Sequence, residues 1–503
     1  ACAVMAGFSQ GGGVGLALSN WMIEGDPGHD IFGMDVARFG DFATLRYTNA
    51  KVRENYSRRF RISFPNEELD AGRPHQTTPI YDLLIKQNAV MGNSWGLENA
   101  LWFAPNGKEA KDLLSFHRSN DFQSIKNEVL SVRNSVGITE ISNFAKYKVS
   151  GPDAESWLSE MMTNNMPKVG SIILTPMLNE FGKLIGDFTI AQIQQNVFYI
   201  WGSQNAQKHH MRWFNKHLNG SEALTIECID LNLVGLSIAG PKSRNVLQKL
   251  VDTDISSENF KFMRLKRMDV SGAPCIVNRI TFTGDLGYEI WMEPSYQRNV
   301  YLSLKSAGEE FNIIDFGTRA LLSMRLEKNF PTWGHELRPI YGPYEGSLDK
   351  FIKLDKNTFI GGNAARIESQ NGPNLKRVSF VIDADDADVM GDEPIWAKVP
   401  KGEFTNAVTE AKDHEPSRFD ENGKTISKTQ SNTSDGEWNV VGWVTSGGYG
   451  HFVDLSLAQG YIPYSLFKEH KDIEFQIEIL GKRYNSKISV DPLFDPSGSV
   501  MRG

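Results

Sequence analysis

The chain of 503 residues is too long for a single hydrophobic core, so the sequence predicts three or four modules. Hydrophobic residues make up 40% and charged residues 23% of the chain, which are the values of an ordinary globular protein. The net charge is −8 and no Lys/Arg-rich run stands out, so neither a nucleic-acid-binding function nor a nucleic-acid partner is expected.

Membrane and metal-binding classes also lack support in the sequence. No apolar run reaches the ~18 residues that a membrane-spanning helix needs, and no segment has the layout of a signal peptide, so we expect no membrane partner. Cys2, Cys228 and Cys275 lie too far apart for a CxxC metal site, and three cysteines do not make a disulfide framework. This cysteine usage favours a reducing compartment and predicts a cytoplasmic location.

The chain opens with an apolar, glycine-rich stretch, as if an upstream portion were absent. Residues 8–25 predict a glycine turn at Gly11, Gly12 and Gly13, followed by a helix. Glycines before a helix allow close backbone approach, and the free amides at the helix start attract electron-rich oxygens. The same pattern also suits a tight loop before a packing helix.

Residues 35–40 and 44–55 predict a linker helix, and 71–102 predicts a short connector whose tryptophans are expected in a core. Residues 136–172 predict strands up to Val149, a Gly-Pro turn and an amphipathic helix. Residues 234–250 repeat the order of strand, Gly-Pro turn and helix. Two such units predict paired α+β halves in which each helix covers one face of a sheet.

The stretch 178–190, LNEFGKLIGDFTI, predicts a β-hairpin with one acid in its second strand. Its Phe-Gly-Lys turn is favourable because glycine tolerates the backbone angles of tight turns. Side chains alternate along a strand, so Asp187 shares a face with Thr189. A carboxylate at this position loses hydration, which raises its pKa and suits it to accept a proton near neutral pH. The alternative is an acid at a strand end that faces solvent.

A second acid-bearing hairpin is predicted at 279–291, RITFTGDLGYEIW. Residues 280–283 predict a strand, 284–287 a glycine turn, and the return strand carries Glu289. Further along, 317–330 predicts a helix that carries Arg325.

The last part of the chain predicts short strands separated by turns, which is typical of a small all-β barrel. The predicted strands are 377–383, 440–444, 456–461, 475–480 and 486–490. Residues 398–438 are polar and charge-dense, with few large apolar side chains, and predict an exposed insertion.

Several of these stretches together resemble the family of folate-binding aminomethyltransferases that includes the T-protein of glycine cleavage. They are GKLIGDFT (182–189), RITFTGDLGYEIW (279–291), RLE (325–327), PYEGSL (343–348), FIGG (359–362) and TSGGYG (445–450). The pattern is most similar to the branch of dimethylglycine dehydrogenase, dimethylglycine oxidase and sarcosine dehydrogenase. Enzymes of that branch join a flavin-dependent, amine-oxidising half to a folate half.

The resemblance implies an α+β, T-protein-like multidomain fold. It comprises two α+β modules of ferredoxin-like or Greek-key type and a C-terminal small β-barrel, preceded by a flavin-domain tail and a connector. The implied domains are 1–40 for the flavin-domain tail, 41–110 for the connector, 111–365 for the folate-binding region and 366–503 for the barrel domain with its insertion.

The resemblance also implies roles for individual residues. Asp187 matches the catalytic acid near the attacking folate nitrogen, and Glu289 matches the pterin anchor. The other matched folate contacts are Thr189, which would help place the cofactor, Arg325 of the RLE motif, and Tyr449 of a turn that faces the folate region. Phe282 occupies the place of a family tyrosine, so its ring can stack on the cofactor but offers no hydroxyl.

The glycine stretch Gly11, Gly12 and Gly13 looks like the last flavin contact of amine oxidases. The GxGxxG motif for the adenine dinucleotide is missing from this sequence, and so is the segment with the family's covalent flavin histidine. FAD binding is therefore expected only with an upstream flavin domain or a partner subunit.

The resemblance implies a tetrahydrofolate-dependent one-carbon transferase. A flavin half oxidises an N-methyl amine such as dimethylglycine or sarcosine, and the folate half captures the carbon as 5,10-methylenetetrahydrofolate. One alternative is a flavin-independent S- or O-demethylase that makes 5-methyltetrahydrofolate from another methyl donor. Another is a folate-binding module without turnover. No HExxH, GxxxxGK[ST] or GxSxG motif supports a zinc, phosphate-loop or serine hydrolase, and the oligomeric state is left open.

Overall fold

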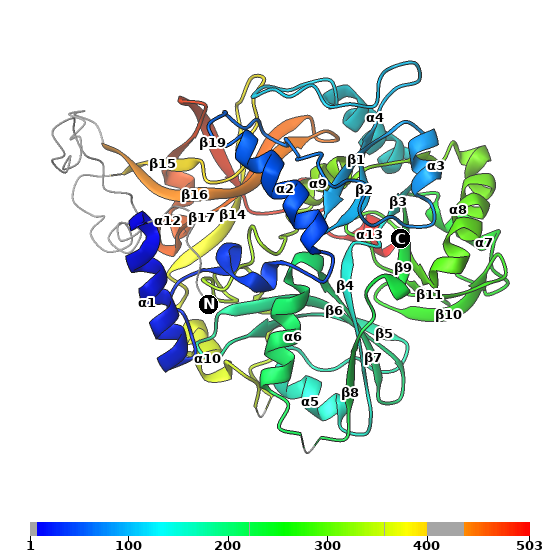
Figure 1. Ribbon diagram of the computed structural model, residues 1–503, viewed down its shortest axis with the longest axis horizontal. Coiled ribbons are helices and arrows are strands. Elements are labelled where there is room, and N and C mark those ends of the chain that lie inside the picture. The colour runs from blue at the N-terminus through cyan, green and yellow to red at the C-terminus, as the bar shows by residue number, and fades with distance from the viewer. Residues whose placement is uncertain (1–7, 221, 357, 400–436) are drawn as a thin grey trace.

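The structure is a computed structural model that describes residues 8–220, 222–356, 358–399 and 437–503. Within these ranges the chain forms a two-stranded hairpin, a five-stranded sheet, a six-stranded sheet and a closed six-stranded barrel (Figure 1). Helices lie against the sheets, so the predicted α+β class with a small C-terminal barrel is confirmed.

The amino-terminal segment is helical, with α1 at one edge of the molecule (Figure 1). Its elements are α1 (Phe8–Glu24), η1 (Phe32–Met34), η2 (Val36–Arg38) and α2 (Leu45–Ser57). Thr44 caps α2, because its side chain accepts a 3.3 Å hydrogen bond from the amide of Tyr47. The helix predicted at 44–55 is therefore confirmed.

The prediction of a glycine turn ahead of α1 is wrong. Gly11, Gly12 and Gly13 lie inside α1 and are exposed, so their amides are not free groups at a helix start. A Cβ atom at any of the three would meet no atom within 4 Å. No close backbone approach therefore calls for glycine here, and these residues form no cradle for a flavin with the described residues.

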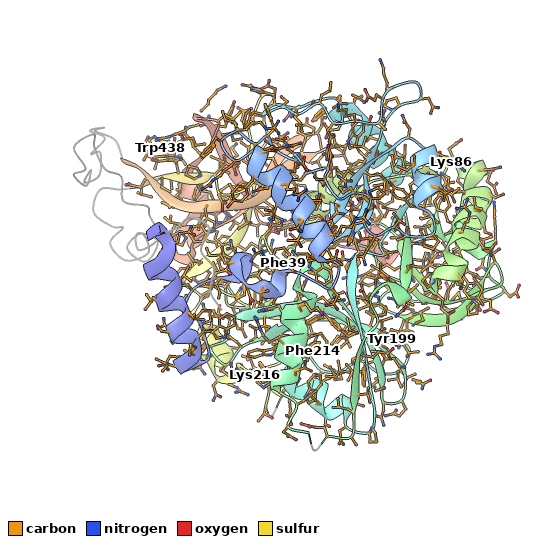
Figure 2. The ribbon with its side chains drawn as sticks, in the orientation of Figure 1. Phe39, Lys86, Tyr199, Phe214, Lys216 and Trp438 are labelled. Carbon is orange, nitrogen blue, oxygen red and sulfur yellow. The ribbon has the colours of Figure 1, made fainter. Side chains whose placement is uncertain are left out.

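The first sheet has the strand order β5-β6-β7-β4-β8 and is covered by α5 and α6. Its elements are β4 (Phe144–Ser150), α5 (Ala154–Met161), β5 (Ser171–Leu178), β6 (Leu184–Gln194), β7 (Val197–Ser203), η3 (Gln204–Ala206), α6 (Gln207–Lys216) and β8 (Thr225–Cys228). Figure 2 labels two side chains of α6, Phe214 and Lys216. Phe214 is fully buried in the core of this sheet, whereas Lys216 forms an ion pair with Glu180.

The second sheet has the order β10-β11-β12-β9-β3-β13. Its strands are β3 (Gly137–Glu140), β9 (Val234–Ala239), β10 (Leu265–Val270), β11 (Ala273–Asn278), β12 (Gly287–Met292) and β13 (Ile314–Asp315). The helices and turns beside it are α4 (Phe122–Asn134), η4 (Asp230–Asn232), α7 (Ser243–Gln248), α8 (Pro294–Gly308), η5 (Glu309–Phe311) and α9 (Thr318–Glu327). Helices α7 and α8 share a buried core with this sheet, and α9 confirms the helix predicted at 317–330.

The strands predicted within 136–149 do not stay in one sheet. β3 pairs with β9 of the second sheet, whereas β4 pairs with β7 and β8 of the first sheet. The chain thus crosses between the two sheets at residues 141–143. Residues 136–149, which the sequence predicts as strands of one unit, therefore contribute to both sheets.

The stretch predicted as a connector also packs against the second sheet. Its elements are α3 (Tyr81–Lys86), β1 (Ala89–Ser94) and β2 (Leu97–Phe103). Ile80, Leu84 and Ala89 belong to the same buried cluster as Ile138 and Leu236 of that sheet.

The barrel closes in the order β14-β17-β16-β15-β18-β19, and β19 pairs back with β14. Its strands are β14 (Leu375–Ile382), β15 (Pro394–Val399), β16 (Glu437–Gly450), β17 (Leu455–Pro463), β18 (Glu474–Ile479) and β19 (Lys482–Ser489). The remaining elements are η6 (Asp349–Phe351), α10 (Gly362–Asn371), α12 (Tyr464–Lys468), η7 (His470–Asp472) and α13 (Ser499–Arg502). Five barrel strands were predicted from the sequence and β15 was missed.

Most of the predicted insertion 398–438, namely 400–436, lies outside the described residues. Residues 398 and 399 end β15, and 437 and 438 begin β16. In the part of the chain that the structure describes, no helix is both long and apolar enough to cross a membrane.

Candidate active site

Asp187 lies in β6, an inner strand of the first sheet. It is opposite Pro176 of β5, and the next residue on the same face, Thr189, is opposite Trp201 of β7. Even-numbered residues 184–190 are buried, whereas Asp187 and Thr189 are half-buried on the other face. The predicted alternation along this strand is confirmed.

The turn before β6 has the conformation that the sequence predicts. The side-chain oxygen of Asn179 accepts hydrogen bonds from the amides of Phe181, at 3.1 Å, and Lys183, at 2.8 Å. Gly182 has φ +76°, and a Cβ atom there would lie 2.7 Å from Cβ of Ala364. Glycine is therefore required by both the backbone angle and the close approach of α10.

The carboxyl group of Asp187 has no partner among the described residues. None of them donates a hydrogen bond to it, and burial alone raises its pKa from 3.8 to about 6. An isolated carboxylate in such surroundings is costly unless a ligand supplies donors. Its raised pKa also lets it take and release a proton close to neutral pH.

Glu289 lies in β12, between Asn278 of β11 and Ser237 of β9 in the pairing register. Its side chain is half-buried, and the indole nitrogen of Trp291 donates a long hydrogen bond of 3.4 Å to it. Burial raises the pKa of Glu289 from 4.5 to about 7. This acid therefore resembles Asp187 in lacking a cation.

The loop before β12 differs from the prediction. Residues 280–283 form no strand, because β11 ends at Asn278, opposite Glu289, and the chain then turns away. Thr281 holds the loop closed by donating 2.8 Å to the carbonyl oxygen of Asp285. Within 281–290, every residue is buried except Phe282 and Glu289, which are half-buried. Phe282 stacks on Phe330, with ring centroids 5.8 Å apart.

The two acids lie on sheet faces that pack against one another. Ala191 and Ile193, on the Asp187 face of β6, belong to the same buried cluster as Trp291, on the Glu289 face of β12. Trp201 joins the two faces, because it is opposite Thr189 in the sheet and its ring centroid lies 5.6 Å from that of Trp291. Asp187, Thr189 and Glu289 are thus brought to one interface between the sheets.

The structure gives Arg325 a different environment from the predicted one. Its side chain is buried and donates to Glu336 at 3.2 Å, to Ser446 at 2.8 Å and to the carbonyl oxygen of Phe330 at 3.1 Å. These contacts join α9 to the barrel strand β16. The contact between this guanidinium and a pterin stays a prediction.

Tyr449 is not in a turn either, because TSGGYG forms the end of strand β16. Its ring packs against Phe122 of α4, with centroids 5.0 Å apart, and the guanidinium of Arg118 lies 4.3 Å from its centre. Its carbonyl oxygen accepts a 2.7 Å hydrogen bond from Ser323 of α9. Tyr449 therefore connects the barrel to α4 and α9, and its role in folate binding stays a prediction.

Asn278, which belongs to none of the sequence motifs, lies beside Glu289. Its side chain is fully buried, and neither its oxygen nor its nitrogen makes a hydrogen bond of 3.5 Å or less with the described residues, although Asn278 lies close enough to moderate the rise in the pKa of Glu289. Such a group is unusual in a folded interior. The alternation within β11 places Asn278 beside Glu289 only once the strand register is known, so no signal in the sequence could have found it.

Comparisons with known proteins agree with this architecture. A sequence model of the GCVT N-terminal domain matches residues 80–356, and one of the glycine cleavage T-protein C-terminal barrel domain matches 376–495. The chain belongs to the GCVT family. A third model, the FAD dependent oxidoreductase central domain, matches residues 24–78 of this family member.

Curated relatives of this GCVT protein include enzymes of amine oxidation. Dimethylglycine dehydrogenase, mitochondrial, of Mus musculus is 33% identical over 496 residues, which are 97% of this chain and 52% of that protein. Sarcosine dehydrogenase, mitochondrial, of the same species is 27% identical and covers 99% of this chain and 55% of its own length. The chain thus spans about half the length of these relatives.

Another relative matches a smaller share of the chain. The aminomethyltransferase of Thermoanaerobacter sp. (strain X514) is 31% identical over 306 residues, which are 60% of this chain and 77% of that protein. The crystal structure of aminomethyltransferase T of the glycine cleavage system from Bartonella henselae matches with a TM-score of 0.64 at 20% identity. It covers 84% of this chain and 98% of its own, so the fold is shared.

The residues at the sheet interface suit a ligand rich in N–H groups. Asp187 and Glu289 offer carboxylate oxygens without cationic partners, and Phe282 offers a half-buried ring. A pterin ring has N–H donors on one edge and two flat faces, so these residue types fit it. Among the described residues, no group of three or more His, Cys, Asp or Glu side chains is placed to hold a metal ion.

Proposed function

We propose that this chain is the folate-dependent part of an N-methyl amine dehydrogenase or oxidase. It transfers the carbon of an oxidised N-methyl group to tetrahydrofolate and forms 5,10-methylenetetrahydrofolate. The observation that carries this proposal is the pair of half-buried acids, Asp187 and Glu289, which have no cationic partner among the described residues and lie on packed faces of two sheets. The similarity to dimethylglycine and sarcosine dehydrogenases supports the choice of amine.

The reaction balances without a further co-reactant. The carbon arrives as a methylene iminium ion or as formaldehyde, and tetrahydrofolate supplies two N–H groups that add to it. Starting from an iminium ion, two new C–N bonds form, the original C–N bond breaks, and the free amine and one proton are released. Starting from formaldehyde, the second product is water.

Asp187 is the proton acceptor in this scheme. The attacking folate nitrogen becomes positively charged when it adds to the carbon, and a carboxylate beside it takes the proton and stabilises that charge. Its pKa of about 6 leaves Asp187 mostly ionised at neutral pH yet able to hold a proton between steps.

Glu289 binds and orients the pterin. Carboxylate oxygens accept hydrogen bonds from the amino group and a ring N–H of the pterin, and a charged acceptor makes these bonds stronger than neutral ones. Phe282 covers one face of the ring, and Thr189 lies on the Asp187 face of β6 to fix the cofactor near that acid.

Calorimetry with tetrahydrofolate tests the proposal directly. We expect saturable binding well below about 1 mM, the upper end of ordinary substrate affinities. Heat exchange indistinguishable from dilution at millimolar folate would contradict a folate function. Chemical analysis of the product then separates methylene from methyl folate, and a methyl product would show direct demethylation instead.

We propose that FAD is bound by a flavin-binding portion that docks on the amino-terminal segment. Large apolar side chains are exposed there, among them Met22, Ile23, Val36, Leu45 and Phe60, each at least 78% exposed. Exposed apolar side chains supply surface for interactions, and the oxidoreductase central-domain model matches residues 24–78, which include Val36, Leu45 and Phe60.

The mass and visible absorption of the protein purified from its native source test this docking. A flavin absorption band that accompanies a mass greater than that of this chain agrees with it. A single species of this chain's mass without flavin absorption contradicts it. The compartment remains a prediction: cysteine usage favours the cytoplasm, whereas the mouse relative is described as mitochondrial.

A further inference from the structure

The loop 279–286, which carries Phe282 and leads into the Glu289 strand, is held by two cations. Arg133 of α4 donates to the carbonyl oxygen of Thr283 at 2.8 Å and to the carboxylate of Asp285 at 2.5 Å. On the other side, the methylene chain of Lys328 lies against Gly284, where a Cβ atom would come within 2.9 Å of it.

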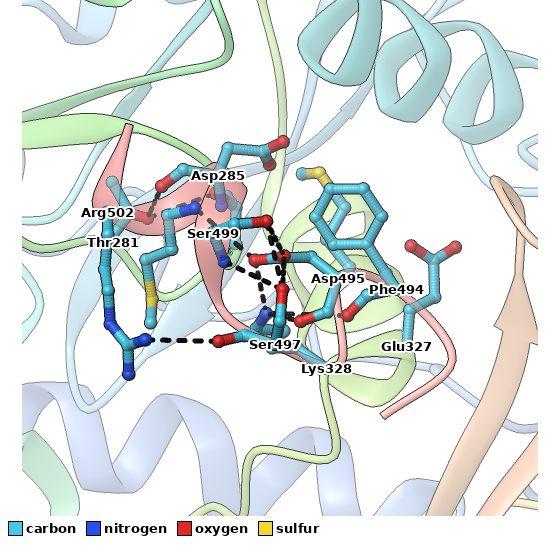
Figure 3. Close-up of polar contacts among 12 residues, drawn as sticks. Thr281, Asp285, Glu327, Lys328, Phe494, Asp495, Ser497, Ser499 and Arg502 are labelled. Atoms are coloured by element: carbon cyan, nitrogen blue, oxygen red, sulfur yellow. Dashed lines mark hydrogen bonds and ion pairs between the residues drawn. The ribbon is translucent and has the colours of Figure 1, made fainter. Parts of the chain in front are cut away.

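Residues 494–503 contact both of these cations, and Figure 3 shows Lys328 beside Asp495. The ring of Phe494 lies over Arg133, with its centre 3.6 Å from the guanidinium carbon. The ammonium group of Lys328 donates to the carboxylate of Asp495 at 2.9 Å and to the carbonyl oxygen of the same residue at 2.6 Å. The side chains of Lys328 and Asp495 are almost completely buried, at 4% and 2% exposure.

Asp495 also organises the segment itself. Ser499 donates to its carboxylate at 3.1 Å and Ser497 at 3.4 Å, and Arg502 closes the turn by donating 3.2 Å to the carbonyl oxygen of Ser497 (Figure 3). The ammonium group of Lys328 and the backbone amides hold the pKa of Asp495 at about 2 against the effect of burial. The carboxylate is therefore ionised throughout the physiological pH range.

A separate contact ties the end of this segment to the first residue of the loop. Arg279 is 1% exposed and donates to the carbonyl oxygens of Phe260, Arg502 and Gly503, the last at 2.9 Å. The segment thus contacts the loop's start directly and its middle through Arg133 and Lys328. Residues 494–503, which follow the barrel in the sequence, therefore hold a loop of the second sheet in place.

We propose that residues 494–503 form a brace that positions the loop 279–286, and through it Phe282 and Glu289, for the pterin. Asp495 is the positioning residue: it touches no substrate and acts through Lys328. This inference rests on the proposed folate function, because it explains how a site in the second sheet is kept in shape by a segment that follows the barrel.

The test is Asp495→Asn, which keeps the side-chain size and removes the charge opposite Lys328. Leaving a buried ammonium without its carboxylate is unfavourable, so Lys328 turns away from Gly284 and the loop loosens. We expect an affinity for tetrahydrofolate about tenfold weaker by calorimetry, and faster amide hydrogen exchange in peptides covering 279–289. Asp495→Glu, which restores the charge, should recover most of the affinity.

Two controls separate positioning from general stability. Asp385→Asn makes the same change in an exposed ion pair of the barrel, with Lys482, and should alter neither measurement. Ile477→Ala removes a buried barrel side chain far from the loop and lowers the melting temperature. It should leave both the folate affinity and the exchange of 279–289 unchanged at temperatures where the variant is folded.

Unchanged affinity and exchange in Asp495→Asn would overturn the brace, as would an equal loss of both in Ile477→Ala. If Asp495→Asn does not fold, Ser499→Ala removes one donor to Asp495 and should shift both measurements in the same direction by less. If the unmodified protein binds no tetrahydrofolate, the proposed function fails, and hydrogen exchange alone then decides whether the brace exists.

Discussion

Glu336 and Asp187 are both acids inside the folded chain, but their surroundings are opposite. Glu336, where α9 meets the barrel, is fully buried and accepts hydrogen bonds from Arg325, Thr332, Thr445 and Ser446. Its pKa is lowered to about 2, because the nearby guanidinium and these donors outweigh burial. Asp187 is half-buried, accepts no hydrogen bond from any residue that the structure describes, and has a pKa raised to about 6.

This difference in partners and pKa distinguishes acids that stabilise the fold from acids that are available to bind a ligand. A buried acid with a cation and several donors is part of the structure, and removing its partner is strongly destabilising. An acid that is desolvated without a partner costs stability, which is a common property of functional sites. Glu289, with one 3.4 Å hydrogen bond and a pKa of about 7, belongs with Asp187.

The largest expected effect on stability comes from breaking the buried ion pair of Arg325 and Glu336. Arg325→Met leaves the carboxylate of Glu336 buried without its cation, so we expect a loss of about 3–5 kcal/mol in the free energy of unfolding. Urea denaturation measures it. Arg298→Met, which breaks an exposed ion pair with Asp82, should leave the free energy of unfolding nearly unchanged.

The same variant decides whether Arg325 also serves the cofactor. If the guanidinium is purely structural, folded Arg325→Met protein binds tetrahydrofolate with unchanged affinity. A loss of affinity under conditions where the variant is fully folded would show that Arg325 reaches the pterin, as the RLE motif predicts. The ion pair of Glu336 would then serve the binding site as well as the fold.

Breaking the unpaired site should give the opposite result. Asp187→Asn removes the proton acceptor, so we expect the rate of one-carbon transfer to fall by about 10²–10⁴-fold. Stability should stay the same or rise, because no partner is lost and the cost of a desolvated charge disappears. Glu180→Gln, in the turn of the same hairpin and paired with Lys216 at the surface, is the matched control. Transfer at the normal rate in Asp187→Asn would remove this acid from the mechanism.

The sequence predicts the Asp187 region well because the interactions there are local. Turn chemistry at 179–183 and the alternation along 184–190 specify a hairpin, and both involve residues close in the chain. Most barrel strands are likewise found by alternation and turns. Strand β15 was missed because its last residues, 398 and 399, belong to the polar stretch 398–438, which separates β15 from its partner β16 in the sequence.

The Glu289 region is predicted less well because distant residues decide it. Nothing in 280–283 shows that Arg133, more than 140 positions earlier, holds this segment out of a strand. Likewise, no local pattern shows that β3 leaves its neighbour β4 to join β9. The same holds for Arg325, whose partner Ser446 lies in the barrel. Propensity and spacing do not report such long-range pairings.

Glu289→Gln is expected to have a smaller effect and to change binding rather than transfer. The amide keeps one acceptor but loses the charge, and hydrogen bonds to charged groups contribute about 1.5–3 kcal/mol. We therefore expect tetrahydrofolate affinity to fall about 10- to 100-fold in calorimetry. Transfer at saturating folate should be largely retained. An equal fall in rate at saturation would mean that Glu289 acts in the chemical step.

The two kinds of acid should also differ in the pH dependence of stability. Glu336 has a lowered pKa, so its contribution is present above about pH 4.5 and is lost as the pH falls towards 2. Asp187 and Glu289 have raised pKa values, so their neutral forms favour folding at low pH. That contribution is lost as the pH rises from about 4 to 7.

Urea denaturation between pH 4 and 7 measures this contrast. Asp187→Asn should reduce the fall in the free energy of unfolding up to about pH 6. Glu289→Gln should reduce the same fall up to about pH 7. Transfer should show the reverse trend, because only ionised Asp187 accepts a proton, so the rate rises with pH through about 6. If neither substitution changes the dependence of the free energy of unfolding on pH, both acids are fully solvated.

The smallest effect is expected from Phe282→Tyr, which adds the hydroxyl that the family carries at this position. Phe282 is half-buried, so a hydroxyl on its ring is not enclosed by the protein and remains available to a bound ligand. One neutral hydrogen bond contributes about 1 kcal/mol, so tetrahydrofolate affinity should rise by at most about fivefold. Phe330→Tyr, on the ring that stacks against Phe282, is the control and should not improve binding. A gain with the control alone would mean that the ligand approaches Phe330 instead, and that the site lies on the other side of this aromatic pair from Glu289.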